Sequence, residues 1–446
     1  VKRYGGIPLI LKAQQLTDPE EELYPKRDTE EAVYNFIISE TSEIANELSE
    51  EAGSGNLGRA TKYAALALKS RAALYAASIA QFGKVQLDGV VGIPAEKAKD
   101  FYQISYEASK EIINSGKFAL YNQDADKVTN FKNIFLVKNN SEVIFAKRHD
   151  SSNGLITGGN GWAVDFFQCP RPQGWNRGNL DGPYLELVEE FEHIDGTSGK
   201  LNRSEVENGL WTMDKLWGKK DPRFFATIYT QETPWKGSYV DYHNGLLLPD
   251  GTIMTKDSYD GVLCTGDQDL EGTCFGVMKY LDESHDNMAG TESAWATSSQ
   301  DFLLFRYAET LLNLAEAAYE LGKKGEALDA INQIRERAGI APLKEISQDK
   351  IRHERKVELA FEGHRYWDVR RWRTATTELS RSFSGLRYIL DYSSYTDDEK
   401  KYKLEILDNI DGSVSAPLFK EENYYLPITL SRTSSNPNMV ENPGYK

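Results

Sequence analysis

The stretch Asp301–Tyr319, DFLLFRYAETLLNLAEAAY, repeats apolar residues at the spacing of one wide face of an α-helix. Gly322 follows it as a helix stop, and Glu326–Ala338 continues as a second helical segment that ends before Gly339. A short glycine-containing turn between two helices predicts a helical hairpin. Gln348–Ala360 follows as a further helical segment.

The first part of the chain has a similar pattern. Asp28-Thr-Glu-Glu opens a helix with an N-cap residue and an acidic first turn. Glycines near 53–55 separate this helix from the Ala- and Leu-rich stretch Arg59–Phe82, and Ala95–Asn114 forms a third helix. Small residues at packing positions let helices approach closely. These helix pairs predict a mainly α-helical fold with tetratricopeptide-like hairpins as the scaffold.

The middle of the chain loses this periodicity. Gly, Asn, Ser, Asp and Pro recur there, and six of the eight tryptophans lie between residues 151 and 300. Long irregular stretches in compact proteins tend to be functional loops. We therefore expect three parts packed into one unit: a helical-repeat part at 1–150, a loop-rich aromatic binding region at 151–300, and helical hairpins with a surface-running tail at 301–446.

Composition excludes several classes of protein. The net charge of −16 repels phosphate backbones, and because no basic stripe opposes it, nucleic acid is not an expected partner. No stretch reaches the roughly eighteen apolar residues of a membrane helix. Three cysteines are too few for a disulfide framework. The sequence leaves open whether Cys264 and Cys274, ten positions apart, form a single disulfide bond or remain separate thiols. The cysteine and histidine spacings match no zinc site.

Aromatic residues among polar neighbours are the candidate binding residues of the middle region. An indole or phenol ring matches the C–H face of a sugar, while amide and guanidinium groups bond its hydroxyls. Trp175 has almost no apolar neighbours in the sequence and is the leading candidate. The candidate glycan-binding residues are Trp175, Trp162, Trp295, Trp235, Tyr239, Tyr242, Asn176 and Arg177.

The segment 354–372 is dense in charged and aromatic residues. Two glutamates four positions apart on one helical face, with histidines nearby, suggest acid–base or metal chemistry. No His-Glu-x-x-His motif is present, however, and paired arginines and carboxylates favour a structural ion-pair network that locks this helix to its neighbours. The residues expected in this network are Glu354, Arg355, Glu358, Arg365, Asp368 and Arg371.

Catalysis is not expected from the motifs. Glycoside hydrolysis needs two carboxylates across a sugar site, but with 68 acidic residues such pairs are unavoidable and indicate nothing. The segment 267–272 begins like a calcium loop, yet Met278 stands where an EF-hand has its last glutamate. We expect no enzyme activity, no metal and no cofactor, with an irregular calcium site at 267–272 left open.

Five segments, in order and spanning both ends of the chain, resemble the SusD/RagB family. In the last of the five segments, the family pattern has Gln or Glu before Asn-Pro-Gly-Tyr, and this chain has Glu441 there. The segments are Arg3-Tyr-Gly-Gly-Ile-Pro-Leu-Ile, Gly58-Arg-Ala-Thr-Lys with the helix after it, Phe305-Arg-Tyr-Ala-Glu-Thr-Leu-Leu, Glu354–Trp372, and Leu426-Pro-Ile with Asn436-Pro-Asn to Glu441-Asn-Pro-Gly-Tyr.

The resemblance implies a function and a location. Family members are surface lipoproteins of the outer membrane of Bacteroidetes-type bacteria, built on four tetratricopeptide-like hairpins. They cap a SusC-like TonB-dependent transporter and help deliver oligosaccharides during nutrient uptake and polysaccharide utilisation. The family's N-terminal portion, with the lipoprotein cysteine and the first hairpin, has no counterpart in this sequence. The anchor is therefore expected upstream of residue 1.

Two other functions remain open from the residues alone. The aromatic residues would also suit a helical-repeat module that binds a peptide or a glycoprotein, because aromatic side chains dominate protein interfaces. A glycoside hydrolase is the third hypothesis, and it would release reducing sugar on prolonged incubation.

Overall fold

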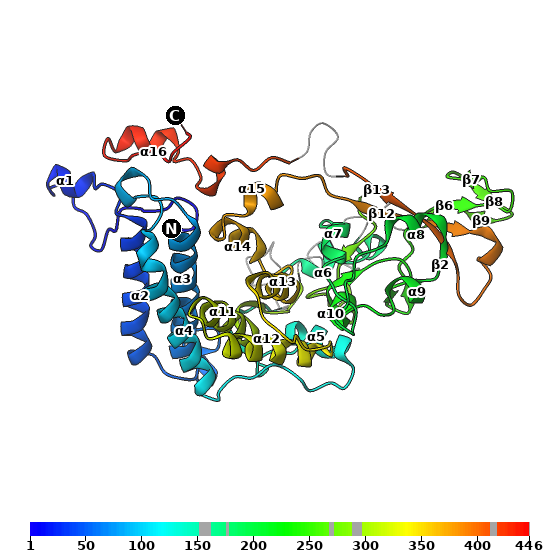
Figure 1. Ribbon diagram of the computed structural model, residues 1–446, viewed down its shortest axis with the longest axis horizontal. Coiled ribbons are helices and arrows are strands. Elements are labelled where there is room, and N and C mark those ends of the chain that lie inside the picture. The colour runs from blue at the N-terminus through cyan, green and yellow to red at the C-terminus, as the bar shows by residue number, and fades with distance from the viewer. Residues whose placement is uncertain (151–161, 175–177, 267–271, 288–296, 411–416, 446) are drawn as a thin grey trace.

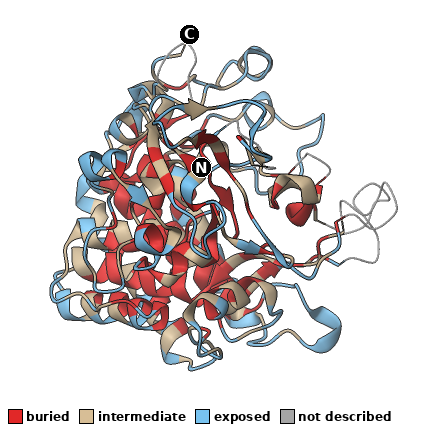
Figure 2. Ribbon diagram, turned by 90° about the vertical axis from the view of Figure 1, so that its right-hand side faces the viewer, coloured by how far each residue is buried: buried red, intermediate tan, exposed pale blue. Residues whose placement is uncertain are grey.

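The computed structural model is mainly helical, as the sequence predicts, with helices at one end and most strands at the other (Figure 1). Buried residues fill the interior of the helical part, and the surface loops are exposed (Figure 2). Within the described ranges no helix is long and apolar enough to cross a bilayer. The structure describes residues 1–150, 162–174, 178–266, 272–287, 297–410 and 417–445.

Three long helices form the N-terminal part of the scaffold. They are α2 (Glu30–Glu47), α3 (Lys62–Phe82) and α4 (Ala98–Asn114). The side chain of Thr29 accepts a hydrogen bond from Ala32 N (3.1 Å) and thereby caps α2. Helix α3 is buried around most of its circumference because its alanines let α2 and α4 pack closely on either side. The predicted helical pairing is confirmed here.

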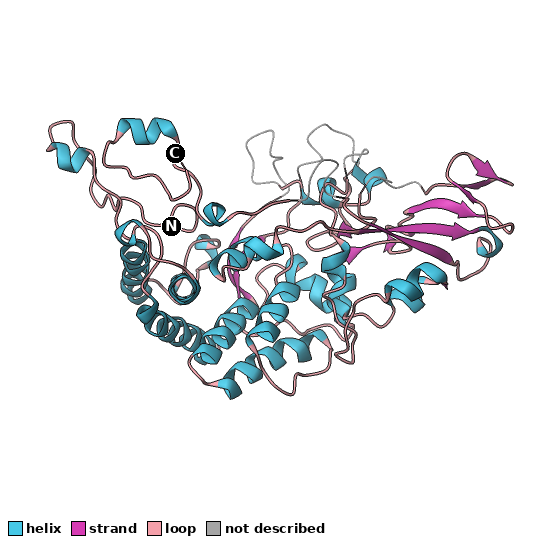
Figure 3. Ribbon diagram, turned by 45° about the horizontal axis from the view of Figure 1, so that its top comes forward, coloured by secondary structure: helices cyan, strands magenta, loops and turns pink. Residues whose placement is uncertain are grey.

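A second set of helices continues this row in space (Figure 3). It consists of α11 (Tyr307–Glu320), α12 (Lys324–Ala338), α13 (Gln348–Glu358) and α14 (Arg365–Arg371). Helix α11 packs on α3, α4, α12 and α13 and so joins the two sets. Gly339 ends α12 in the left-handed conformation (φ 77°), which glycine adopts without a steric penalty.

The predicted start of α11 at Asp301 is wrong. Residues Phe302–Arg306 form strand β11, which pairs antiparallel with β1 (Val143–Lys147). The run of apolar residues from 302 to 305 satisfies both a helical face and a buried strand, so its spacing alone does not separate the two. Residues 302–306 form a strand because they pair with β1, which lies more than 150 residues away in the chain.

The opposite end of the molecule holds a five-stranded sheet in the order β2-β13-β12-β6-β7. Its centre is the antiparallel pair β12 (Gly385–Asp391) and β13 (Tyr402–Leu407), which the sequence pattern did not predict. Strand β6 (His243–Leu247) lies parallel to β12. The outer strands are β2 (Leu210–Trp211) and β7 (Ile253–Met254).

Shorter helices and strands make up the rest of the described structure. The tail contains the short helix α16, although its Pro- and Asn-rich sequence favours turns over helix. The helices are α1 (Glu20–Leu23), α5 (Lys127–Leu136), α6 (Val164–Gln168), α7 (Leu185–Val188), α8 (Arg203–Asn208), α9 (Met213–Trp217), α10 (Pro222–Thr227), α15 (Ala375–Glu378) and α16 (Leu430–Ser435). The short strands are β3 (Ile228–Tyr229), β4 (Pro234–Trp235), β5 (Ser238–Tyr239), β8 (Ser258–Tyr259), β9 (Val262–Leu263) and β10 (Gly276–Val277).

The middle region and the C-terminal part share one core. Phe275 and Leu246 from the middle pack in the same apolar cluster as Leu386 and Leu404 from β12 and β13. All three cysteines are buried and none forms a disulfide bond, so Cys264 and Cys274 are not bridged. Apolar clusters contain residues from both sides of positions 150 and 300. The division of the chain into three parts at these positions stays a prediction.

Charged side chains of α13 lie in a buried ion-pair network. Glu354 contacts Arg223 (2.6 Å) and Arg335 (3.0 Å). Glu358 contacts Arg306 (2.7 Å) and Arg223 (2.9 Å). Burial opposes ionisation of Glu358, but the surrounding guanidinium groups outweigh it and hold its pKa well below the usual range. The partners come from distant parts of the chain, so the network fixes α13 to α10, β11 and α12.

The remaining residues of the expected network lie on α13 and α14. Asp368 contacts Arg355 (2.8 Å) and Arg371 (2.9 Å), and all three side chains are almost fully buried. Arg365 differs, because it pairs with Glu378 at a half-exposed position outside the network. The structure therefore places five of the six expected residues in two buried ion-pair clusters, one around Glu354 and Glu358 and one around Asp368, and it corrects the assignment of Arg365.

Candidate ligand-binding site

An open cleft of about 710 Å³ lies in the middle region, between the β4–β5 hairpin and the segment that follows Leu281. Its volume falls within the range of small-molecule sites. Most of its lining side chains are polar, and several are charged. The lining residues are Gln173, Lys236, Glu283, Ser284, His285 and Asp286.

Lys236 is placed by the tight turn between β4 and β5. Its φ of 50° and the φ of 75° at Gly237 give two successive left-handed residues, the geometry of a two-residue hairpin turn. Left-handed backbone is unfavourable for lysine, so neighbouring contacts must stabilise the turn. Lys236 N donates to a Glu283 carboxylate oxygen (2.6 Å), and its ammonium group donates to the carbonyl of His285.

Asp165 on α6 forms hydrogen bonds with the segment 282–287, which lines the cleft. Its carboxylate accepts hydrogen bonds from Asp282 N (2.7 Å) and from the Gln300 amide (2.8 Å). Its carbonyl accepts a bond from the Asn287 side chain (2.8 Å). Burial raises the pKa of Asp165, although these hydrogen bonds act in the opposite direction. Asp165 therefore holds both ends of the segment that carries Glu283, Ser284 and His285, one through its carboxylate and the other through its backbone carbonyl.

Trp162 is half-buried next to this support. Its ring lies 5.1 Å from the ring of His149 and 5.2 Å from that of Tyr280, measured between centroids. Its backbone exchanges hydrogen bonds with Ser298 in an isolated β-bridge. The indole thus packs against other rings, and only part of its surface is left for a ligand.

The structure contradicts two of the predicted ring platforms. Trp235 and Tyr242 are 4% and 0% exposed, and both belong to the large core cluster. Tyr242 stacks on Tyr229 with ring centroids 6.3 Å apart. A buried ring offers no face to a sugar, so these two residues are corrected to core residues. Tyr239, on the same hairpin as Trp235, is 66% exposed and keeps an open ring.

Four further candidates lie outside the described residues. They are Trp175, Asn176, Arg177 and Trp295, and most of the segment considered for calcium, 267–271, also lies outside. In sequence, Trp175 follows the cleft residue Gln173 by two positions, and Trp295 follows Asp286 by nine. These assignments stay predictions.

The sequence-based search missed the residues that line the cleft. Its criterion was an aromatic residue among polar neighbours, and the segment Asp282-Glu-Ser-His-Asp contains no aromatic residue. Five consecutive polar residues in an aromatic-rich region were the available signal. In chemical terms the cleft offers an amide, an ammonium, an imidazole, a hydroxyl and two carboxylates. This set suits a ligand with many hydroxyl groups, since it holds both donors and acceptors.

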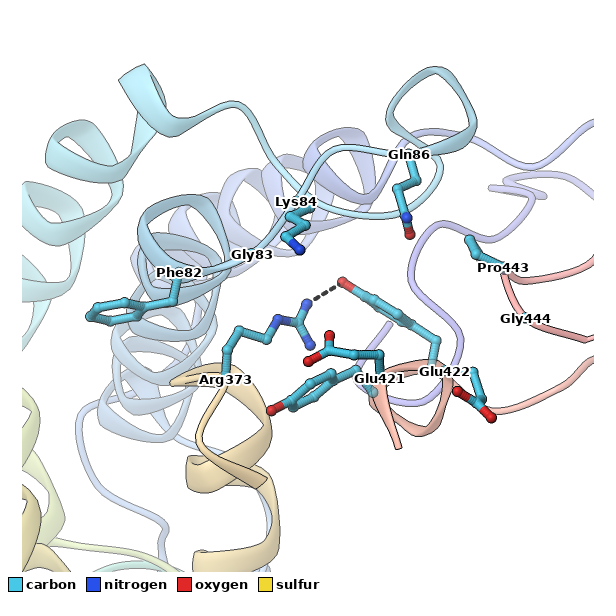
Figure 4. Close-up of a pocket in the computed structure, with 11 residues that line it drawn as sticks. Phe82, Gly83, Lys84, Gln86, Arg373, Glu421, Glu422, Pro443 and Gly444 are labelled. Atoms are coloured by element: carbon cyan, nitrogen blue, oxygen red, sulfur yellow. Dashed lines mark hydrogen bonds between the residues drawn. The ribbon is translucent and has the colours of Figure 1, made fainter. Parts of the chain in front are cut away.

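Two other clefts lie away from the aromatic middle. One, of about 440 Å³, lies beside β1. The other, of about 370 Å³, lies between the end of α3 and the C-terminal tail, where the side chains of Lys84, Arg373 and Glu421 point towards one another (Figure 4). Among the residues that the structure describes, no group of three or more His, Cys, Asp or Glu side chains is arranged to hold a metal ion.

Several curated proteins are similar to this chain. A SusD-like protein of Bacteroides ovatus is 26% identical over 99% of this chain and 70% of its own length. The starch-binding protein SusD of Bacteroides thetaiotaomicron is 23% identical over 94% of this chain and 66% of its own length. The chain thus spans about two-thirds of the length of these two relatives.

Solved structures give the same result for the fold. A SusD-like protein from Bacteroides fragilis superimposes with a TM-score of 0.71 at 25% identity, covering 100% of this chain and 76% of that protein. A SusD-like carbohydrate-binding protein from the same species gives a TM-score of 0.67 at 23% identity, covering 98% of this chain and 76% of that protein. The sequence profile of the SusD family matches residues 141–445. This chain therefore belongs to the SusD family.

Proposed function

We propose that this protein binds glycans at the bacterial cell surface without catalysing a reaction. The observation that carries the proposal is a polar cleft of about 710 Å³ within the aromatic middle region of a SusD-family chain. Two similar proteins, one named as starch-binding and one as carbohydrate-binding, support the same class of ligand.

The chemistry of the cleft supports an oligosaccharide ligand. Lys236 and Gln173 can donate to sugar hydroxyls, while Glu283 and Asp286 can accept from them. The exposed ring of Tyr239 can lie against a C–H face. Such contacts are individually weak, so we expect an affinity near micromolar, about −8 kcal/mol, or weaker.

The partner and the location are part of the same proposal. We propose that the protein acts as an outer-membrane lipoprotein and passes its ligand to a SusC-like TonB-dependent transporter. Family membership supports this assignment. Co-purification of the two proteins from outer membranes of the native host would test it, and a protein that fractionates away from every such transporter would contradict it.

An oligosaccharide panel in titration calorimetry tests the ligand class. We expect heat with at least one glycan and a several-fold weaker affinity in Lys236→Ala, because the ammonium group that lines the cleft is removed. Lys219→Ala is the matched control, since Lys219 is exposed away from the cleft and should bind like the unaltered protein. Heat with peptides alone would favour the peptide-binding hypothesis. Release of reducing sugar would favour a glycoside hydrolase.

Trp175→Ala tests the leading ring candidate separately. We expect weaker retention in a glycan affinity gel with no change in thermal stability, because an open ring that stacks on sugar contributes little to folding. A fall in the melting temperature with unchanged retention would make Trp175 a core residue instead.

A further inference from the structure

A small, partly open cavity lies where the N-terminal segment meets α2, α3, α14 and the C-terminal tail. Its volume is about 20 Å³, enough for one particle of about the size of a water molecule. Nearly all of its wall is polar or aromatic, which distinguishes it from a packing defect in an apolar core. The residues that matter here are Lys2, Glu30, Tyr34, Tyr75, Arg370 and Arg373.

Four buried polar atoms of this wall have no hydrogen-bond partner among the described residues. They are Glu30 Oε1, Tyr34 Oη, Tyr75 Oη and Arg370 Nε. Their residues are between 0% and 3% exposed. Buried polar atoms in folded proteins are nearly always paired, because an unpaired one loses its bonds to water without compensation. Four such atoms around one cavity indicate that a polar species inside it supplies the missing partner.

The cavity also has an excess of positive charge. Lys2, Arg370 and Arg373 make no ion pair within the described ranges. Lys2 Nζ lies 4.3 Å from the ring centroid of Tyr75, and Arg373 donates to Tyr425 Oη (2.7 Å). Arg370 donates to the Tyr366 hydroxyl (2.9 Å) and to main-chain carbonyls. Rings, hydroxyls and carbonyls thus take the place of the carboxylates that usually balance buried cations.

Glu30 is the one carboxylic acid of the cavity wall, and it does little to offset this charge. Its Oε2 accepts bonds from Gly92 N and from the Tyr425 hydroxyl, both at 2.7 Å. Burial raises the pKa of Glu30, which favours a proton on the unpaired Oε1. Burial also lowers the pKa of Lys2 to about 8, so its ammonium form still predominates at neutral pH.

We propose that this cavity binds a small monovalent inorganic anion of the chloride class. Lys2 and Arg370 supply charged donors, and the hydroxyls of Tyr34 and Tyr75 supply neutral ones. A water molecule would satisfy some of these donors but would leave Lys2 and Arg370 without a negatively charged partner in the cavity. The cleft shown in Figure 4 lies next to the cavity, and the two share Arg373, Tyr424 and Tyr425 as lining residues.

Bound there, the anion joins segments that are far apart in sequence. It bridges Lys2 of the N-terminal segment, Tyr34 of α2, Tyr75 of α3 and Arg370 of α14. The anion then adds to the hydrogen bonds that already hold the N-terminal segment, such as those from Gly6 N to Val90 O and from Leu426 N to Arg3 O, both 2.7 Å. This site is separate from the glycan cleft, so neither proposal depends on the other.

Crystals soaked in bromide test occupancy directly. We expect an anomalous bromide peak inside the cavity of the unaltered protein and its loss in Tyr34→Phe combined with Tyr75→Phe. Electron density for a water molecule without an anomalous peak, or an empty cavity, would overturn the proposal.

Thermal unfolding at constant ionic strength gives an independent measurement. When chloride replaces gluconate, which is too large for the cavity, we expect the melting temperature to rise by about 2 °C for each tenfold increase above the dissociation constant. The double phenylalanine variant should lose this dependence, whereas Tyr239→Phe, at an exposed position, should keep it. Equal dependence in all three proteins would mean surface screening alone and would overturn the proposal, as would no dependence in the unaltered protein.

Discussion

Residues with similar neighbours in the sequence have opposite environments in the structure. Trp235 and Tyr239 stand four positions apart on one hairpin, yet they are 4% and 66% exposed. The core cluster that covers Trp235 is built largely from residues far away in the chain, such as Leu390 and Tyr402. A residue's suitability as a sugar platform is therefore decided by the side chains that pack on it, and local polarity does not reveal them.

Arg306 is the residue whose loss should destabilise the fold most. It contacts Glu142 (2.7 Å), Glu358 (2.7 Å) and Glu362 (2.6 Å) in the interior. Arg306→Met removes a cation that contacts all three buried carboxylates. Arg337 still contacts Glu142 and Glu358, and Lys279 still contacts Glu362, but the charge of the buried cluster is no longer balanced. We therefore expect a loss of about 3–5 kcal/mol in the free energy of unfolding. Chemical denaturation measures this loss. Arg365→Met is the control and should cost about 1 kcal/mol or less, because its ion pair is half-exposed. If both variants lost the same free energy of unfolding, burial of the ion pairs of Arg306 would not be what makes them stabilising.

Among the elements, α3 shows why the scaffold needs small side chains. It packs between α2 and α4, and Ala73, Ala76 and Ala77 are all 0% exposed. Close approach of helix backbones is feasible only where side chains are short. The alanine-rich sequence of this helix therefore predicted its helical state and the close approach of its neighbours, whereas its position between α2 and α4 is seen only in the structure.

Ala73→Leu tests this requirement. The larger side chain has no space between the helices, so we expect a destabilisation of about 1–3 kcal/mol. Glu40→Leu on the exposed face of α2 is the control and should stay within about 0.5 kcal/mol. Urea denaturation monitored by far-UV circular dichroism compares the two variants. If Ala73→Leu were as stable as the control, α3 would be less tightly packed than described.

At the scale of the whole molecule, charged groups buried between elements make stability depend on pH. Burial lowers the pKa of His364 to about 4, and the nearby charges of Arg71 and Arg355 act in the same direction. Burial opposes ionisation of Glu309, but the charge of Arg71 outweighs it and lowers the pKa to about 2. Both groups stay unprotonated in the folded protein at pH values where the unfolded chain already binds the proton.

Stability should therefore fall as the pH drops. Between pH 6.5 and about 4 the unfolded state binds more protons than the folded state at His364, and between pH 4.5 and about 2 it does so at Glu309. We expect urea midpoints to decrease from pH 7 to pH 4. In His364→Gln, the decrease above pH 4.5 should be smaller. A midpoint that stayed constant from pH 7 to pH 5 would contradict this assignment.

The sequence by itself determined the helical scaffold. The spacing of apolar residues in 307–338 and the caps and glycine stops of the N-terminal helices are local signals, and a helix forms its hydrogen bonds locally. The charged segment 354–372 likewise predicted ion pairing, although the partners Arg223, Arg306 and Arg335 could not be named, because they are supplied by other parts of the chain.

Only the tertiary structure decided the sheet and the candidate site. The pairing of β12 with β6 and of β1 with β11 joins residues more than 100 positions apart. A strand forms its hydrogen bonds with another strand, so its own sequence does not identify its partner. The same holds for the cleft, where Gln173, Lys236 and Asp286 meet from three separate segments. Burial is a property of the folded neighbourhood, so which rings face solvent could be read only once distant side chains had been placed around them.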